Sequence, residues 1–319
     1  MKFSDEQARY LAKFIAKNMI ARTDVKASQL PRGQGAYVRN DSKWTMTDLM
    51  AHVKGEQTYG HYLLDQDSNV KIIAFDIDLA QTGWYVPFSP EDLLRYIEDP
   101  DLMNDEQFIE FNPREAWADR KHPARPWLKH QMRELADRFA SAMQVSGIKT
   151  FATYSGSKGV HVYGILGERT PAADARILAH GIMDFVASDL VYQTIHNVGG
   201  TQVIEYHEYE VAASKGKSFY YLKCDTASRY RSFDNFSIEV FPKQDHIEPN
   251  RLGNLMRLPF GKNLKNPKDP TFVIDQCAAS SSLVPITDFD TLKTRLESGE
   301  PYGSFDVWGK YTNSTDATA

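Results

Sequence analysis

Two aspartates separated by one residue end a strongly apolar run in the first third of the chain. Asp76 and Asp78 follow residues 70–75, which are apolar on both faces from Ile72 onward. Because alternate side chains of a strand point to the same face, the two carboxylates should project together, with α-carbons about 6–7 Å apart. Two-metal sites hold their ions about 3.5–4 Å apart, so such a pair could share both ions. An Asp-x-Asp pair is also common where a strand enters solvent, so the pair alone is a weak signal.

A third carboxylate, Glu239, lies inside the later apolar run 236–241. Such a carboxylate costs stability unless a charged group satisfies it, and a metal ion would do so. An edge strand with one solvated face would explain Glu239 equally well. Asp234 and Asp245 are alternative third acids nearby.

A glycine-rich segment joins two further strand-like runs and reads Ser155-Gly156-Ser157-Lys158-Gly159, with His161 just beyond it. Glycines allow close backbone approach and let N–H groups turn toward an anion, and Lys158 adds a positive charge. His161 could donate to a triphosphate oxygen or bind near a metal. The segment lacks the Gly-Lys-Ser/Thr and the following helix of a P-loop. A flexible turn with a surface histidine is the alternative.

Two more segments carry cations suited to phosphate. Lys243 follows Glu239 closely, and Arg257 and Lys262 flank a short apolar run within residues 253–262. Solvated surface is the usual place of such side chains and is the alternative here. Together with three carboxylates and a glycine loop, they form the set that nucleotidyl transfer needs. We therefore interpret the chain as a template-directed polymerase or primase.

The elements that must position these residues alternate between helices and strands. Ser4 and Gln7 indicate a capping box at the start of the first helix, and Thr170-Pro171 begins a helix that should reach about Tyr192. Two other helices are expected to begin at Thr47 and at Ser89. A long helix should end at about Met143, and a last one should cover 288–296. Hairpins are predicted for 62–64 with 70–75 and for 150–154 with 160–163, and further strands over 35–38, 202–206, 219–222, 236–241, 255–258 and 271–274. This order predicts an α+β fold with a mainly antiparallel, RRM-like catalytic sheet, flanking helices and an α-rich N-terminal part.

The bulk properties fit a globular protein. The chain has 319 residues, 42% of them hydrophobic, a net charge of −5 and two cysteines. The charge argues against a histone-like DNA binder, and the cysteines form neither a disulfide framework nor a zinc clip. The apolar runs are too short to cross a membrane, so a cytoplasmic location is expected, in the bacterial host if the protein is phage-encoded. We predict one catalytic domain over 1–300, with an α-rich part at 1–58, a core at 59–285, and a partly disordered tail at 301–319.

Over about residues 60–265 the chain resembles the archaeo-eukaryotic primase superfamily, especially phage- and plasmid-type primase–polymerases. The resemblance rests on an apolar strand ending in Asp-x-Asp, a Ser-Gly-x-x-Gly-x-His loop, a later acidic strand, and a Gly-Asn-x-x-x-Leu-Pro-x-Gly stretch at 253–261. It implies that Asp76, Asp78 and Glu239 are catalytic metal ligands. It also implies that Ser155 and His161 hold the incoming triphosphate.

The sequence departs from the family in four respects. The family often has Ser-x-His where Gly159 precedes His161, so a hydroxyl contact would have to come from Ser155 or Ser157. The third acid is Glu rather than the commoner Asp. The cysteines for a zinc knuckle are missing, and so is a Walker-type motif. A helicase partner would therefore be on another chain or in a missing C-terminal region.

The resemblance and the residues together predict two-metal nucleotidyl transfer with two Mg²⁺ or Mn²⁺ ions. The partners would be dNTP or NTP and a single-stranded DNA template with its primer, and no membrane. The nucleotide-binding set is Ser155, Ser157, Lys158, His161, Lys243 and Arg257.

Template binding needs cations with stacking aromatics, which residues 120–133 around Trp127 and residues 215–233 both offer. Ordinary packing and solvated surface would explain both segments as well.

Two rival functions use the same residues. A metal-dependent nuclease or phosphodiesterase would need the acids but no triphosphate cradle. A non-catalytic single-strand-binding module would keep its affinity, which depends on salt, without Asp76 and Asp78.

Overall fold

The computed structural model describes residues 2–31, 36–85, 109–190, 192–198, 201–207, 209–213, 219–224, 233, 235–280 and 282–298. The largest element is a seven-stranded sheet in the order β11-β12-β13-β4-β8-β7-β15. Its strands are β4 (Asn69–Leu79), β7 (Lys149–Tyr154), β8 (Gly159–Pro171), β11 (Tyr209–Ala213), β12 (Tyr220–Cys224), β13 (Phe236–Phe241) and β15 (Phe272–Val273). All of its pairings are antiparallel, which confirms the predicted α+β class.

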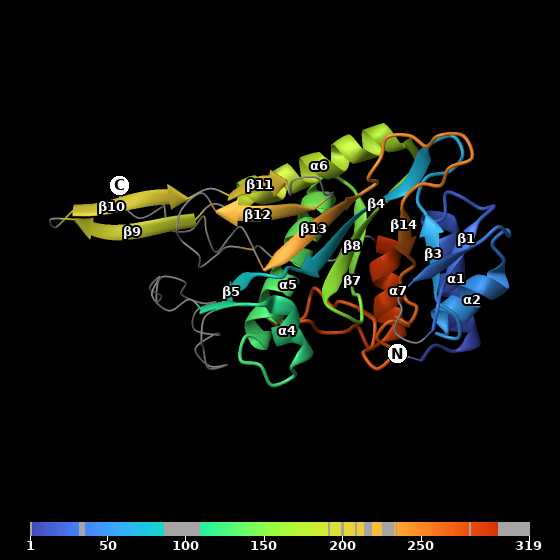
Figure 1. Cartoon of the computed structure of the whole chain (residues 1–319), viewed down its shortest axis with the longest axis horizontal. Helices are drawn as coiled ribbons and strands as arrows, with labels where there is room; N and C mark the ends of the chain where they lie inside the picture. Colours follow the sequence, from blue (N-terminus) through green and yellow to red (C-terminus); the bar gives the residue numbers. More distant parts are fainter. Residues whose placement is uncertain are drawn as a thin grey trace.

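The helices α5 (Arg125–Val145) and α6 (Ala172–Asp189) cover one face of this sheet (Figure 1). The strand period of two explains which face of β4 they cover. Phe75 and Ile77 are fully buried, and the Phe75 ring lies 4.4 Å from that of Phe139 on α5. Asp76 and Asp78 alternate with these residues, so their carboxylates project from the opposite face.

A second, four-stranded sheet has the order β14-β3-β1-β2. It contains β1 (Lys26–Gln29), β2 (Tyr37–Asn40), β3 (Tyr59–Tyr62) and β14 (Leu255–Arg257). The hairpin predicted for 62–64 with 70–75 is therefore wrong, because β3 and β4 belong to different sheets. The turn at residues 65–69 does close tightly, with the Asp65 N–H bonded to the Asn69 carbonyl, but it passes the chain from one sheet to the other.

The N-terminal helices α1 (Asp5–Asn18) and α2 (Met46–Val53) pack against each other. The capping box of Ser4 and Gln7 is confirmed by the reciprocal hydrogen bonds between them. Two further helices are α4 (Pro113–Ala118) and α7 (Phe289–Ser298). Helix α6 begins as predicted but ends at Asp189, three residues before Tyr192. The helix predicted at Ser89 and the tail at 301–319 lie outside the described residues.

Two strand pairs stand apart from the main sheets: β5 (Gly83–Tyr85) with β6 (Ile109–Phe111), and β9 (Tyr192–Val198) with β10 (Thr201–His207). The β9–β10 hairpin extends away from the rest of the chain in Figure 1.

The four-stranded sheet takes strands from both sides of residue 58. The predicted division into 1–58, 59–285 and 301–319 stays a prediction. No helix in the described parts of the chain is long and apolar enough to span a bilayer.

Two fully buried histidines in the N-terminal region predict a loss of stability in acid. Burial lowers the pKa of both His52 and His61 from 6.5 to about 4. As the pH falls, the two histidines are protonated in the unfolded chain before they are protonated in the folded chain. The stability that the two neutral histidines contribute is therefore complete above pH 6.5 and is lost as the pH falls toward 4. Among the described residues, neither ring nitrogen of His61 has a hydrogen-bond partner, so a charge there would be unpaired. We expect the unfolding free energy to fall by up to about 1.4 kcal/mol per pH unit for each residue.

Urea unfolding of the wild type and of His61→Phe between pH 7.5 and 4.5 tests this. The variant removes the titration without removing a hydrogen bond, so its stability should fall less steeply with acid. His246→Gln is the control, because the His246 side chain is 74% exposed. An unchanged slope in His61→Phe would contradict the prediction.

Candidate active site

The three predicted acids lie on two neighbouring central strands and face one another. In the antiparallel register, Asp76 of β4 stands opposite Glu239 of β13 on one side and His161 of β8 on the other. Asp78 stands opposite Ser237 and Gly159. Directly opposed side chains in antiparallel strands have β-carbons about 4.5–5.5 Å apart. The three strands therefore bring the acids and the histidine together at one end of the sheet.

A cavity of about 290 Å³ opens over these strands and is lined by all nine predicted site residues: Asp76, Asp78, Ser155, Ser157, Lys158, His161, Glu239, Lys243 and Arg257. Segments far apart in the chain thus meet in one place. The far wall comes from the four-stranded sheet, which contributes Arg257 from β14 and Tyr37 from β2. The cavity therefore lies between the two sheets.

Lysines pair with two of the three carboxylates. The Lys158 Nζ lies 2.6 Å from Asp78 Oδ2, and the Lys243 Nζ contacts Glu239 Oε2. The third carboxylate has no lysine partner among the described residues: Asp76 Oδ1 is buried, makes no hydrogen bond of good geometry, and lies 3.4 Å from the His161 Nε2. Its burial, together with the nearby Asp78 and Glu239 charges, raises the pKa of Asp76 well above its ordinary value. A positive charge placed beside Asp76 would therefore be favourable.

His161 is a buried, neutral side chain, which rules out the alternative of a surface histidine. It is 8% exposed, and burial lowers the pKa of its imidazole to about 3. Its Nδ1 lies 3.0 Å from the Tyr163 Oη, and its Nε2 lies 3.4 Å from Asp76 Oδ1. At neutral pH the ring can offer one N–H and one lone pair, but no charge.

The chemistry of the donors fits a divalent cation. Three carboxylates supply hard oxygen ligands of the kind that Mg²⁺ and Mn²⁺ prefer. Asp76 lies two residues before Asp78 on β4 and opposite Glu239 on β13. Within the described residues, no three acidic, histidine or cysteine side chains are already grouped tightly enough to form a metal cluster. Two of the three acids are engaged with lysines instead. Metal binding would have to replace those ion pairs.

The glycine loop between β7 and β8 is shaped by close contacts at both glycines. Gly156 has a φ of +69°, a conformation that favours glycine. A β-carbon at Gly159 would lie 2.2 Å from the Ile77 carbonyl oxygen and 2.4 Å from Asp78 Oδ1. A serine side chain therefore has no room at position 159, two residues before His161. Ser155 and Ser157 are the hydroxyl-bearing residues of the loop that line the cavity.

The family described as the TOTE conflict system, archaeo-eukaryotic primase domain, matches residues 14–196. The chain belongs to this family. The match confirms the predicted superfamily and covers Asp76, Asp78 and the glycine loop, whereas Glu239 lies beyond it. No curated protein matches the sequence. The expectation of a phage- or plasmid-type replication enzyme stays a prediction, and nothing in the sequence analysis pointed to a conflict system.

Membership establishes the broad chemistry of this primase domain. The family is of the nucleotidyltransferase type and implies binding of nucleotides and nucleic acid. Its domains typically use divalent metals.

Several residues of the primase domain line the cavity without having been predicted: Gln29, Tyr37, Asn254, Asn263 and Lys265. Asn263 donates to the Ser155 carbonyl and is bonded in turn to Gln29. Lys265 and Asn263 continue the predicted segment 253–262 by only three residues, so extending that segment would have found them. Nothing in the local sequence distinguishes Gln29 or Tyr37.

The alternative third acids do not reach the site of the primase domain. Asp245 pairs with Arg176 of α6 and does not line the cavity. Asp234 lies outside the described residues. Lys262 is exposed and lines no part of the cavity, so its suggested phosphate role has no support from its position.

Much of the predicted template track at 120–133 is part of the protein's packing. Trp127 is 4% exposed and Arg133 is also 4% exposed, both on α5. The Arg125 guanidinium stacks 4.3 Å from the centre of the Trp117 ring. Trp127 therefore cannot stack on bases in this structure, and the alternative of ordinary packing holds for it and for Arg133. Most of the second track, 215–233, lies outside the described residues, so that hypothesis stays a prediction.

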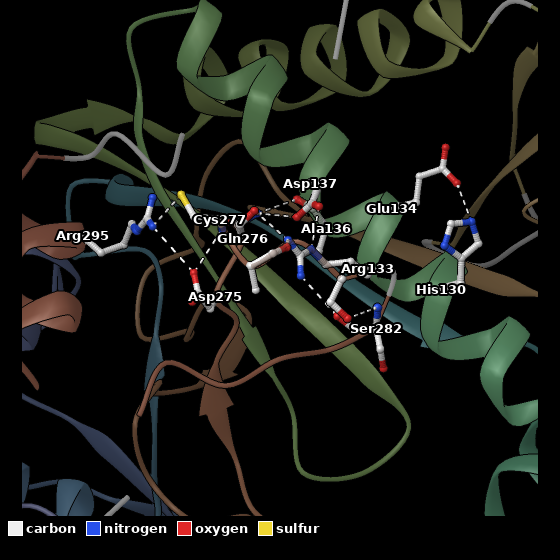
Figure 2. A network of polar contacts seen from close by, with 12 residues as sticks. His130, Arg133, Glu134, Ala136, Asp137, Asp275, Gln276, Cys277, Ser282 and Arg295 are labelled. Atoms are coloured by element: carbon white, nitrogen blue, oxygen red, sulfur yellow. Dashed lines mark hydrogen bonds and ion pairs between the residues drawn. The ribbon is translucent and has the colours of Figure 1, made fainter. Parts of the chain in front are cut away.

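Arg133 instead fastens the loop after β15 to α5 (Figure 2). It donates to Asp137 at 2.6 Å, to the Gln276 carbonyl at 2.6 Å and to the Ser282 carbonyl at 3.2 Å. We expect Arg133→Met to lower the unfolding free energy by about 2–3 kcal/mol, because buried acceptors lose a charged donor. Arg120→Met is the matched control: the Arg120 side chain is 76% exposed and pairs with Asp269, so its loss should cost about 0.5 kcal/mol or less. Urea unfolding measures both, and equal effects would contradict the assignment.

Proposed function

We propose that this primase domain extends or initiates DNA strands by template-directed nucleotidyl transfer from dNTP or NTP. The observation that carries the proposal is the meeting of Asp76, Asp78 and Glu239 with the glycine loop in one cavity. The acids come from adjacent strands, and the loop is the turn between the next two strands of the same sheet. Acids and phosphate-binding groups in one place suit transfer of a nucleotide better than hydrolysis alone.

The charges that line the cavity favour a polyanionic ligand next to cations. Four cationic side chains, Lys158, Lys243, Arg257 and Lys265, surround three carboxylates. In the proposed complex the cationic side chains neutralise the triphosphate, and Ser155, Ser157 and His161 donate hydrogen bonds to it. His161 suits this role because its burial keeps it neutral and fixed in orientation.

The acids Asp76, Asp78 and Glu239 would hold two Mg²⁺ or Mn²⁺ ions. Such ions, when bound, lower the pKa of the attacking 3′-hydroxyl and offset charge on the phosphates. The 3′-hydroxyl gives up its proton to solvent, its oxygen forms a bond to the α-phosphorus of the nucleotide, and the bond from that phosphorus to the bridging oxygen breaks to release pyrophosphate. The protein's part is chiefly positioning and neutralisation of charge.

Primer extension on a single-stranded DNA template tests the proposal. The purified chain, Mg²⁺ or Mn²⁺, and either dNTP or NTP should give products that lengthen with template-directed sequence. Omitting the primer then separates de novo priming from extension. Shortened primer without extension would favour the nuclease alternative. Template binding without either product would favour the non-catalytic binding module, and both results would overturn the proposal. A helicase on another chain is not required for this assay.

A further inference from the structure

The carbonyl of Ser157, at the centre of the glycine loop, accepts two hydrogen bonds from side chains of other elements. The indole Nε1 of Trp117, on α4, donates to it at 2.6 Å. The phenol Oη of Tyr154, at the end of β7, donates to it at 2.7 Å. A carbonyl oxygen has two lone pairs, so these two donors saturate it. The orientation of the Ser157–Lys158 peptide is therefore fixed from outside the loop.

Fixing this carbonyl also fixes the N–H of Lys158. A trans peptide is planar, and its C=O and N–H groups point in opposite directions. Ser157 and Lys158 line the cavity, whereas Trp117 and Tyr154 do not. Because neither donor lines the cavity, the carbonyl should point away from the cavity and the Lys158 N–H toward it. Among the described residues, no protein acceptor bonds to this N–H.

We propose that Trp117 and Tyr154 are positioning residues that hold the Lys158 N–H toward the cavity to bind a phosphate oxygen of the incoming nucleotide. This inference rests on the proposed function and extends it to two side chains that do not touch the substrate. The Lys158 side chain and its own backbone N–H would then act on the same phosphate chain. Backbone N–H groups fixed in this way bind anions without reorganisation when the ligand arrives.

Both donors are buried. Trp117 is 8% and Tyr154 7% exposed. The Arg125 guanidinium packs on the Trp117 ring and donates to the Trp117 carbonyl, which anchors that residue to the start of α5. Burial raises the pKa of Tyr154 to about 12, so its hydroxyl keeps the proton that it donates. The pair therefore forms a rigid support for a peptide that would otherwise be free to rotate.

Removing single donors tests the proposal by equilibrium binding. Trp117→Phe and Tyr154→Phe keep an aromatic ring but lose the N–H or O–H. With Ca²⁺ as a divalent ion that supports binding, each should weaken dATP binding about five-fold, and the double variant about 20-fold. Binding of deoxyadenosine, which has no phosphate, should stay unchanged. Trp44→Phe is the matched control, because the buried Trp44 Nε1 has no hydrogen-bond partner in the described part of the chain.

A second measurement uses the wild type alone, so it stands even if a variant unfolds. Amide hydrogen exchange at Lys158 should slow on addition of dATP with Ca²⁺ but not of deoxyadenosine. Wild-type protein that binds no dATP would end the proposed function itself. Wild type that binds dATP without protecting Lys158, or folded Phe variants that bind it as tightly as the wild type, would overturn only the roles of Trp117 and Tyr154.

Discussion

Replacing Asp78 by asparagine is expected to reduce nucleotide addition by at least about 1000-fold while the protein remains folded. Asparagine has nearly the same shape but no charge, so it cannot offset the positive charge of a divalent ion. Asp78 lies on the central strand β4 and points to the face away from the helices, so the core should not be disturbed. Its one ion pair, with Lys158, is partly exposed and contributes little to stability. Asp76→Asn should lose activity to a similar degree.

The matched control is Asp245→Asn, which removes an acid near Glu239 in sequence that lies outside the cavity. Its rate of primer extension should match that of the wild type. Binding of Mn²⁺, followed by electron paramagnetic resonance, gives a readout that does not depend on turnover. Asp78→Asn should bind Mn²⁺ more weakly than Asp245→Asn. Full primer extension by a folded Asp78→Asn protein would remove the acids from the mechanism.

The sequence was sufficient to find the acids and the loop because strand geometry is local. Asp76 and Asp78 share a face through the period of two, and the apolar residues before them predicted a central strand, which β4 is. The hairpin that carries the glycine loop was likewise predictable from two runs and a short turn. Local pattern could not supply the register of β13 against β4, which places Glu239 opposite Asp76. The two residues are separated by more than half of the chain. The combination of residue types and the family resemblance both suggested that meeting, but neither supplies the register.

Other features depend on packing between distant elements and escaped prediction. Residues 62–64 and 70–75 look like a hairpin in sequence, yet β3 finds better partners in β1 and β14. The basic residues around Trp127 resembled an exposed track, although Trp127 and Leu135 are two helical turns apart and share the buried side of α5. Helical spacing could have revealed this. Trp117, by contrast, meets the glycine loop only through the tertiary fold, because it lies 40 residues before Ser157 in the chain. Tyr154 lies only three residues before Ser157, but the local sequence does not show that its hydroxyl donates to the Ser157 carbonyl.

Gly159→Ala should damage both catalysis and stability. The added β-carbon would lie 2.2 Å from the Ile77 carbonyl and 2.4 Å from the Asp78 carboxylate. Strands β4 and β8 pair at this point, so the collision can be relieved only by moving the Asp78 side chain or separating the strands. A displacement of about 1 Å in a catalytic group costs about 100-fold in rate. We expect kcat for primer extension to fall by at least that factor, and the unfolding free energy by about 1–3 kcal/mol.

Alanine variants at two other glycines serve as controls that distinguish an effect on the site from an effect on stability. A β-carbon at Gly164, also on β8, would lie 2.5 Å from the Met143 Sδ, far along the strand from the acids. Gly164→Ala should therefore lose stability but keep kcat. Gly181 of α6 has open space around it, so Gly181→Ala should be neutral or stabilising by up to about 1 kcal/mol. If Gly159→Ala lost no more activity than Gly164→Ala at equal fractions of folded protein, then the close fit of β8 against Asp78 would be a matter of packing alone. A selective loss in Gly159→Ala would instead tie the missing side chain at 159 to the placement of the Asp78 carboxylate.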